Sequence, residues 1–117
     1  MFNKLRYMVE KNFELNRSFD NKKDISREEF KKFLKTNTII IDVRSPQEYR
    51  EGHVKGAISI PEYQIKRDIQ RYIQNKNELI VLYCSTGHRS QRAQRILENM
   101  GYTNVFNIYG GINEFNF

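Results

Sequence analysis

Cys84 is the only cysteine in this chain of 117 residues, and it opens the segment CSTGHR, which ends at Arg89. A thiolate is a strong nucleophile, and positive charge or backbone N–H groups beside a cysteine favour the thiolate over the thiol. Without a second cysteine the chain cannot form an internal disulfide, which fits a reducing compartment. Cys84 is therefore either a reactive thiol or an inert buried one.

Two elements are expected to position Cys84. Residues 79–83, LIVLY, have the length and apolar character of a strand, and residues 90–100 place apolar side chains at helical spacing. A turn at the start of a helix presents unpaired N–H groups, and the helix dipole adds positive charge there. The pattern thus predicts a strand, a turn that favours an anionic sulfur, and a helix whose buried face is Ala93, Ile96, Leu97 and Met100.

Further strands are predicted from short apolar segments. Residues 38–43, TIIIDV, have the continuous β-branched pattern of a strand covered on both faces, and residues 57–60 and 104–108 predict shorter strands. Alternation with amphipathic segments indicates an α/β domain with a mostly parallel sheet, in which ligands lie beyond the carboxyl ends of the strands. The residues expected at that edge are Cys84, Asp42 and Arg44.

Helices are predicted after Ser26 and Ser45, because a glutamate follows each serine three residues later, as in a capping box. The first helix is expected to begin at Arg27 and to bury Phe30, Phe33 and Leu34. The second is expected to end near Glu51. A third helix, over residues 65–73, is expected to bury Ile65, Ile69, Tyr72 and Ile73, and a terminal helical turn containing Ile112 and Phe115 is expected after Gly110 and Gly111.

Residues 1–22 are expected to form an N-terminal extension with one apolar helical face, which packs on the domain or on a membrane surface, and residues 21–24 to form a linker. The longest apolar run, residues 79–84, is far shorter than the roughly 20 residues of a membrane span. The charged N-terminus lacks the apolar centre of a signal peptide. The expected location is therefore the cytoplasm.

The net charge of +6 is spread along the chain. No block of basic residues interleaved with aromatic ones is present, so nucleic acid is not an expected partner. Two histidines and one cysteine at these separations form no recognisable metal set, and neither a metal nor a cofactor is expected.

The motifs and their order resemble the rhodanese-like sulfurtransferases. The matching pieces are IIIDVRSPQEYREGHVKGAISIP and LIVLYCSTGHRSQRAQRILENMGYTNVFNIYGGI, joined by a helical connector and covering about residues 24–115. The resemblance rests on DVR, E-Y-x-x-G-H, C-x-x-G-x-R-S and the final GG occurring together and in order. It implies a rhodanese-like domain over residues 23–117, with three layers in which helices flank a mostly parallel sheet of about five short strands.

The resemblance also implies that Cys84 accepts a sulfane sulfur as a persulfide and passes it on. Thiosulfate or a persulfide would be the donor, and a thiol, cyanide, sulfite or a protein would be the acceptor. Without a second cysteine, the sulfur must leave to another molecule. Four residues separate Cys84 from Arg89, as in sulfurtransferases of this family, whereas related dual-specificity phosphatases have five. A cysteine-dependent phosphatase or arsenate reductase and a noncatalytic binding or sensor module are the alternatives.

The family's active-site loop falls on Ser85, Thr86, Gly87, His88, Arg89 and Ser90. The hydroxyls of Ser85 and Thr86 either bond bound sulfur or satisfy the turn. Gly87 is expected to supply a backbone conformation that a side chain obstructs. Arg89 is expected to brace the loop through carbonyls and a carboxylate in preference to binding an anionic donor, and His88 to tune charge. Ser90 is expected to cap or line the first helical turn.

Three residues are expected to support this loop from outside it. Asp42 is expected to act as a hydrogen-bonding anchor for the neighbouring turns in preference to an acid catalyst. Arg44 and Glu48 stand four residues apart and either pair or remain solvated charges. His53, in the turn GHVKG, is expected to be structural.

Overall fold

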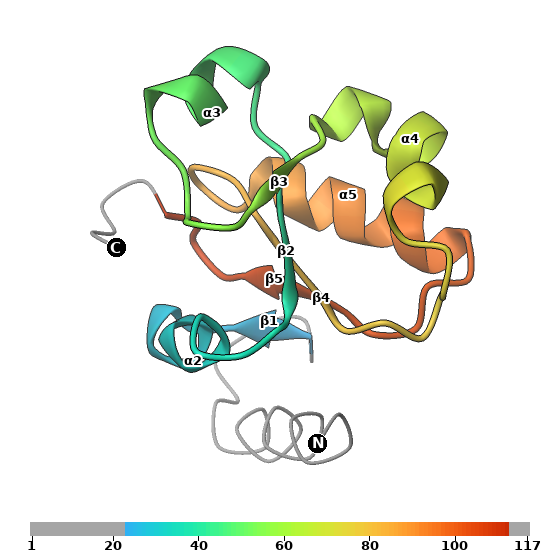
Figure 1. Cartoon of the computed structure of the whole chain (residues 1–117), viewed down its shortest axis with the longest axis horizontal. Helices are drawn as coiled ribbons and strands as arrows, with labels where there is room; N and C mark the ends of the chain where they lie inside the picture. Colours follow the sequence, from blue (N-terminus) through green and yellow to red (C-terminus); the bar gives the residue numbers. More distant parts are fainter. Residues whose placement is uncertain (1–22, 113–117) are drawn as a thin grey trace.

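The computed structural model of the protein describes residues 23–112 (Figure 1). The predicted helical face of residues 1–22 and most of the predicted terminal turn lie outside the described residues. The elements, in chain order, are β1 (Asp24–Ile25), α2 (Arg27–Phe33), β2 (Ile39–Asp42), α3 (Pro46–Glu51), β3 (Ile58–Ser59), the 3-10 helix η1 (Glu62–Gln64), α4 (Ile65–Tyr72), β4 (Ile80–Tyr83), α5 (His88–Asn99) and β5 (Val105–Ile108).

The five strands form one sheet in the order β1-β5-β4-β2-β3, and every neighbouring pair is parallel. Asp42 at the end of β2 lies beside Tyr83 at the end of β4, and Asn107 on β5 lies beside Leu82. The carboxyl ends of the central strands therefore meet at one edge of the sheet. The predicted α/β architecture is confirmed, including the covered central strand within residues 38–43.

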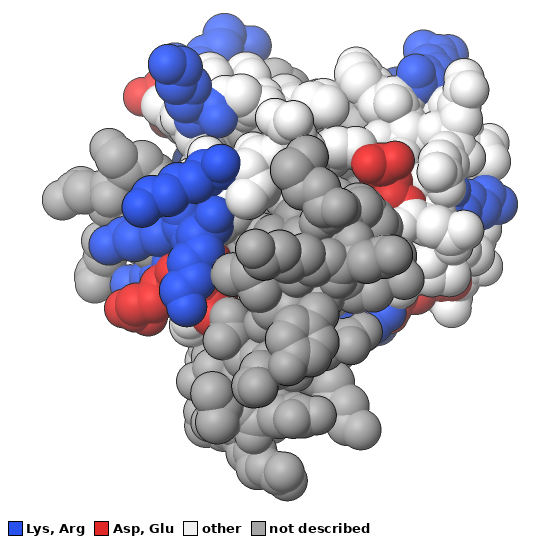
Figure 2. Space-filling view, turned by 60° about the horizontal axis from the view of Figure 1, so that its bottom comes forward, with Lys and Arg blue, Asp and Glu red and all other residues white. Residues whose placement is uncertain are grey.

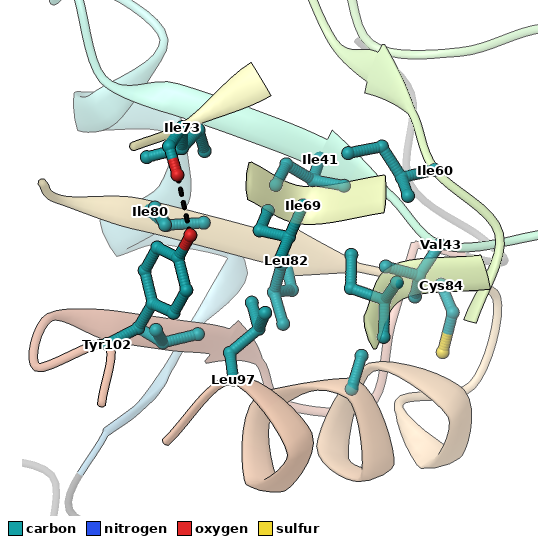
Figure 3. Close-up of a cluster of buried hydrophobic side chains, with 13 residues drawn as sticks. Ile41, Val43, Ile60, Ile69, Ile73, Ile80, Leu82, Cys84, Leu97 and Tyr102 are labelled. Carbon is teal, nitrogen blue, oxygen red and sulfur yellow. Dashed lines mark hydrogen bonds between the residues drawn. The ribbon is translucent and has the colours of Figure 1, made fainter. Parts of the chain in front are cut away.

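Alternation along the strands places apolar side chains on both faces of the sheet. On one face Ile40, Val81 and Phe106 pack with Phe30 and Phe33 of α2. On the other face the strands pack with the buried sides of α4 and α5 (Figure 3) through Ile41, Ile80, Leu82, Val105, Ile65, Ile69, Ala93 and Leu97. Helices thus cover both faces, which gives the three layers that the resemblance implies.

Both predicted capping boxes are present and fix the starts of α2 and α3. The hydroxyl of Ser26 accepts a hydrogen bond from the Glu29 N–H, and the Glu29 carboxylate accepts one from the Ser26 N–H. Ser45 and Glu48 form the same pair, with Pro46 in the first turn. Because each box satisfies N–H groups that a helix start leaves unpaired, these short helices begin where the pattern predicts.

Three details differ from the sequence predictions. Asp24, expected in a linker, lies in the two-residue strand β1, which pairs with β5. Tyr72, expected in the core, is 54% exposed, because α4 ends there and the chain turns to extended backbone at Ile73. Helix α5 begins two residues before the expected residue 90, and its Ile96 and Met100 are only partly buried.

Most Lys and Arg side chains within residues 23–112 are exposed. Helix α2 exposes Lys31 and Lys32 beside the acidic Glu28. Figure 2 shows Lys and Arg side chains gathered along one side of a face, with acidic side chains next to them. Within residues 23–112, no helix combines the length and the apolar character needed to cross a bilayer.

Candidate active site

Cys84 follows β4 directly, and the chain then turns into α5. Gly87 makes this turn with φ of +96°, a left-handed conformation that suits glycine, and the helix begins at His88. The Sγ of Cys84 accepts hydrogen bonds from the N–H of Gly87 at 3.0 Å and from that of Ser90 at 3.4 Å. Cys84 is fully buried at one end of the apolar cluster drawn in Figure 3. The turn thus directs backbone donors at the sulfur, an arrangement that suits an anion.

The turn at Gly110 and Gly111 packs behind this loop. The N–H of Ile112 donates to the carbonyl of Cys84 at 3.0 Å, and Arg27 Nε donates to the carbonyl of Gly111 at 3.2 Å. Gly111 has φ of +72°, and a Cβ at this position would overlap the Ser85 carbonyl. Only glycine lets the two backbone segments approach this closely, so this turn sets the position of the first half of the loop.

Arg89 braces the loop through the carboxylate of Glu48 on α3. Its two terminal nitrogens donate to the two carboxylate oxygens at 2.7 and 3.0 Å, and the two side chains are 31% and 30% exposed. These hydrogen bonds are the main reason why the pKa of Glu48 lies far below its ordinary value and that of Arg89 above it. The predicted brace through a carboxylate is present, while no hydrogen bond from Arg89 to a carbonyl is found among residues 23–112. The pairing of Arg44 with Glu48, which the spacing allowed, is wrong.

Asp42 anchors the ends of β2 and β4 as expected. It is fully buried and accepts hydrogen bonds from the Arg44 N–H at 2.9 Å, from the Arg44 guanidinium at 2.7 to 3.1 Å, and from the Tyr83 hydroxyl at 2.7 Å. Arg44 also donates to the carbonyl of Gly52 at 2.6 Å. Asp42 raises the pKa of Arg44, and burial raises that of Tyr83. Asp42 and Arg44 therefore hold the segment around α3. Their contacts are with Tyr83 and Gly52 and not with Cys84.

The remaining loop side chains have contacts of their own. The Ser85 hydroxyl donates to Glu48 at 3.2 Å, so it supports the Glu48 carboxylate that braces Arg89. Thr86 and His88 are exposed, and the Thr86 hydroxyl lies 3.1 Å from His88 Nδ1. Outside the loop, the ring of His53 stacks on Tyr49, with centroids 3.6 Å apart, which fits the structural role expected for it.

Ser90 connects the sulfur to buried residues that sequence reasoning missed. Its Oγ lies 3.4 Å from Cys84 Sγ and 3.1 Å from the Gly87 carbonyl, and it donates to Asn107 Oδ1. Asn107 Nδ2 in turn donates to Asp24 Oδ1 at 3.1 Å. Asn107 lies on β5 and Asp24 on β1, far from the loop in sequence. The available signal was an asparagine within the apolar segment VFNI, where a buried polar side chain requires partners.

Comparison with known proteins finds relatives over the segment that carries these motifs. Residues 26–116 match the Rhodanese-like domain family. The thiosulfate sulfurtransferase PspE of Escherichia coli strain K12 is 44% identical to this chain over 70 residues, which are 60% of this chain and 67% of PspE. The solved structure of a rhodanese with anions from E. coli aligns with a TM-score of 0.61 and 41% sequence identity, over 65% of this chain and 89% of that chain.

Relatives with another activity share the domain. The tRNA uridine(34) hydroxylase of Photorhabdus laumondii is 31% identical over 83 residues, which are 68% of this chain but only 24% of that protein. The shared segment is therefore about a quarter of that relative, and membership of the family does not by itself name a reaction. Because the family match covers most of its length, the chain belongs to the rhodanese-like domain family.

Proposed function

We propose that this protein is a sulfurtransferase that carries a sulfane sulfur as a persulfide on Cys84. The observation that carries the proposal is the buried Cys84 sulfur, which accepts two backbone N–H groups of a turn that leads into a helix. Such a site stabilises negative charge without a metal or a cofactor. The activity for which the relative PspE is named, thiosulfate sulfurtransferase, supports the same reaction class.

The proposed reaction has two half-reactions on one nucleophile. The Cys84 thiolate attacks the sulfane sulfur of thiosulfate, a new S–S bond forms, and sulfite leaves with the electron pair of the broken bond. With a persulfide donor, a thiolate leaves instead. An acceptor thiolate, cyanide or sulfite then attacks the outer sulfur, and Cys84 leaves as the thiolate. Because the chain has one cysteine, this second step needs an acceptor molecule, either small or a protein.

The loop side chains have separate proposed roles. Arg89 keeps the loop in shape through Glu48, while the first-turn N–H groups of α5, which have no partners within the helix, face the outer sulfur of the persulfide. Ser85 supports the brace. Thr86 and His88 line the exposed side of the loop, where His88 tunes the charge that an incoming donor meets. A single free thiol fits a reducing compartment, and we propose the cytoplasm.

Intact-mass measurement tests the proposal directly. After incubation with thiosulfate or polysulfide, the full chain is expected to gain the mass of one sulfur atom, and cyanide is expected to remove it with release of thiocyanate. The Cys84→Ser protein is the control and is expected to gain nothing. No gain in the native chain, or an equal gain in the Cys84→Ser protein, would contradict the persulfide. Turnover of a phosphate ester or arsenate without sulfur loading would favour phosphatase or reductase chemistry. The absence of any activity would favour a binding module.

A further inference from the structure

A buried chain of polar groups connects the Cys84 sulfur to the edge strand β1. It runs from Sγ to the Ser90 hydroxyl at 3.4 Å, then to Asn107 Oδ1, and from Asn107 Nδ2 to Asp24 Oδ1 at 3.1 Å. The four residues are at most 1% exposed. Inside a protein such hydrogen bonds are strong and cannot be exchanged for bonds to water, so each one constrains the next.

The chain has a defined direction. The Asp24 oxygen accepts a hydrogen bond, so the amide nitrogen of Asn107 must face it and the amide oxygen must face Ser90. Two oxygens in hydrogen-bonding contact need a hydrogen between them, and only Ser90 can supply it. A serine hydroxyl has a single hydrogen. Ser90 therefore presents lone pairs, and no hydrogen, to Cys84 as long as its hydroxyl donates to Asn107 or to the Gly87 carbonyl, which lies 3.1 Å away.

We propose that Asn107 is a positioning residue that draws the Ser90 hydroxyl hydrogen away from Cys84 and so withholds one hydrogen bond from the sulfur. A hydroxyl whose lone pairs face the sulfur accepts from an S–H group but gives no hydrogen bond to a thiolate. When Cys84 carries a negative charge, the hydroxyl can rotate toward Sγ at the expense of the Asn107 bond. Asn107 thereby sets how readily the sulfur ionises.

The role of Asn107 in catalysis rests on the proposed sulfur transfer. When an acceptor takes the outer sulfur, the S–S bond breaks and its electron pair stays on Cys84 Sγ. A rotation of the Ser90 hydroxyl from Asn107 to this new thiolate would stabilise the leaving group. Asn107 would thus hold Ser90 in reserve until the second half-reaction.

A double-mutant cycle in the full chain tests the proposal. The thiolate is titrated with pH by its ultraviolet absorbance, and the Cys84→Ser protein serves as the blank for tyrosine ionisation. Asn107→Leu leaves the Ser90 hydrogen to the Gly87 carbonyl or to the thiolate. Because a hydrogen bond to a charged acceptor is the stronger one, the midpoint of thiolate formation is expected to fall by about one pH unit. In a Ser90→Ala background, where no hydroxyl can donate, the same Asn107→Leu change is expected to leave the midpoint of thiolate formation unchanged.

A merely structural role for Asn107 gives a different result. If Asn107→Leu acted by loosening the loop or by removing the partner of Asp24, it would move the midpoint of thiolate formation equally in the Ser90 and the Ser90→Ala backgrounds. An equal shift in both backgrounds, an upward shift or no shift would each overturn the proposal. The cycle retains the charged groups around the loop in all four proteins, namely Asp24, Asp42, Glu48, His88, Arg89 and Arg92.

Two safeguards keep the test decisive. If Asn107→Leu does not fold, as judged by circular dichroism, the smaller Asn107→Ala takes its place in the same cycle with the same expected shifts. The titration uses no sulfur donor. Its failure therefore counts against the role of Asn107 alone, whereas failure of the mass experiment counts against sulfur transfer.

Discussion

Glu48 collects hydrogen bonds from three segments of the chain. It accepts from the Ser45 N–H at the start of α3, from Arg89 on α5, and from the Ser85 hydroxyl in the loop. One carboxylate thus closes a capping box and ties the loop to α3. Because the carboxylate is only 30% exposed, its hydrogen bonds are partly shielded from water, and they depend on its negative charge.

Replacing Glu48 with Gln is expected to lower the free energy of unfolding by about 1 kcal/mol near neutral pH, after allowance for partial exposure, and to slow sulfur loading of Cys84. The pKa of Glu48 is lowered by folding, so its stabilisation is complete above its unfolded value of about 4.3 and is lost as pH falls further. Urea unfolding at about pH 7 and about pH 3 should therefore show a smaller difference between the two proteins at the lower pH.

The matched control for this comparison is Glu51→Gln. Glu51 lies on the same helix but is exposed, so little change in stability is expected at either pH. If the Glu48→Gln difference stayed constant on acidification, the charge of Glu48 would not be the source of its effect.

Asp42 is expected to be the more costly residue to change. Asp42→Asn leaves the guanidinium of Arg44 without its charged partner in a site where Asp42 is fully buried and the Arg44 side chain is 11% exposed. Removing one member of a buried ion pair costs about 3 kcal/mol or more. Urea unfolding measures this loss, with Asp68→Asn as the control that changes less, because its partner Arg67 is 67% exposed although Asp68 itself is only 12% exposed. A small loss at Asp42 would mean that Arg44 finds other acceptors.

At the scale of elements, the loop and the turn at Gly110 and Gly111 form one packed unit. Gly111→Ala would push its Cβ into the backbone of Ser85 and Thr86, so the loop must shift. We expect the folded protein to lose most of its sulfur loading, as measured by intact mass. Gly56→Ala is the matched control, since it has φ of +84° but open space around a Cβ.

Both glycine variants introduce a side chain at positive φ, so each is expected to lower the free energy of unfolding by about 1 kcal/mol. Only the Gly111 variant is expected to lose loading. Full loading of Gly111→Ala would show that the loop tolerates displacement by the turn.

Local signals predicted most elements, because their causes lie within a few residues. The capping boxes at Ser26 and Ser45 each lie within one helical turn. The run of isoleucines in β2 favours a buried strand whichever strands lie beside it. The strand β1 was missed because two residues are too few to show any periodicity. It is a strand only because β5 pairs with it.

At the scale of the whole molecule, the first described residues pair with the end of the chain at β5. The Lys23 carbonyl accepts the Asn107 N–H at 3.0 Å, and the Ile25 carbonyl accepts the Tyr109 N–H at 2.9 Å. We propose that the domain begins at residue 23, as the division into residues 1–22 and 23–117 predicts. A chain that starts at Lys23 is expected to unfold cooperatively.

The matched truncation starts at Ser26, so it removes β1 and keeps the capping box of α2. It loses the burial of Ile25, which is worth about 2 kcal/mol, as well as the Asp24 bond to Asn107, so its melting temperature is expected to be clearly lower. Thermal unfolding followed by circular dichroism compares the two chains. If the chain from Lys23 failed to fold, the domain boundary would lie earlier.

The candidate site was predictable where its residues adjoin in sequence and unpredictable where they do not. The loop from Cys84 to Ser90 and the anchoring role of Asp42 follow from motifs and from the meeting of parallel strand ends. Glu48 as the partner of Arg89, and Asn107 as the partner of Ser90, depend on how separate elements come together. Spacing along the chain allowed Arg44 and Glu48 either to pair or to remain solvated, whereas in the structure Arg44 pairs with Asp42 and Glu48 with Arg89.

The position of β5 between β1 and β4 has a consequence for the order of folding. Synthesis proceeds from the N-terminus, so Asp24 leaves the ribosome long before Asn107, from which it is 83 residues distant, and β1 has no partner until then. The Cys84 carbonyl likewise waits for Ile112. Contacts of such long range slow folding. The loop that holds Cys84 therefore gains its contacts with Asn107 and Ile112 only as the last strand joins the sheet.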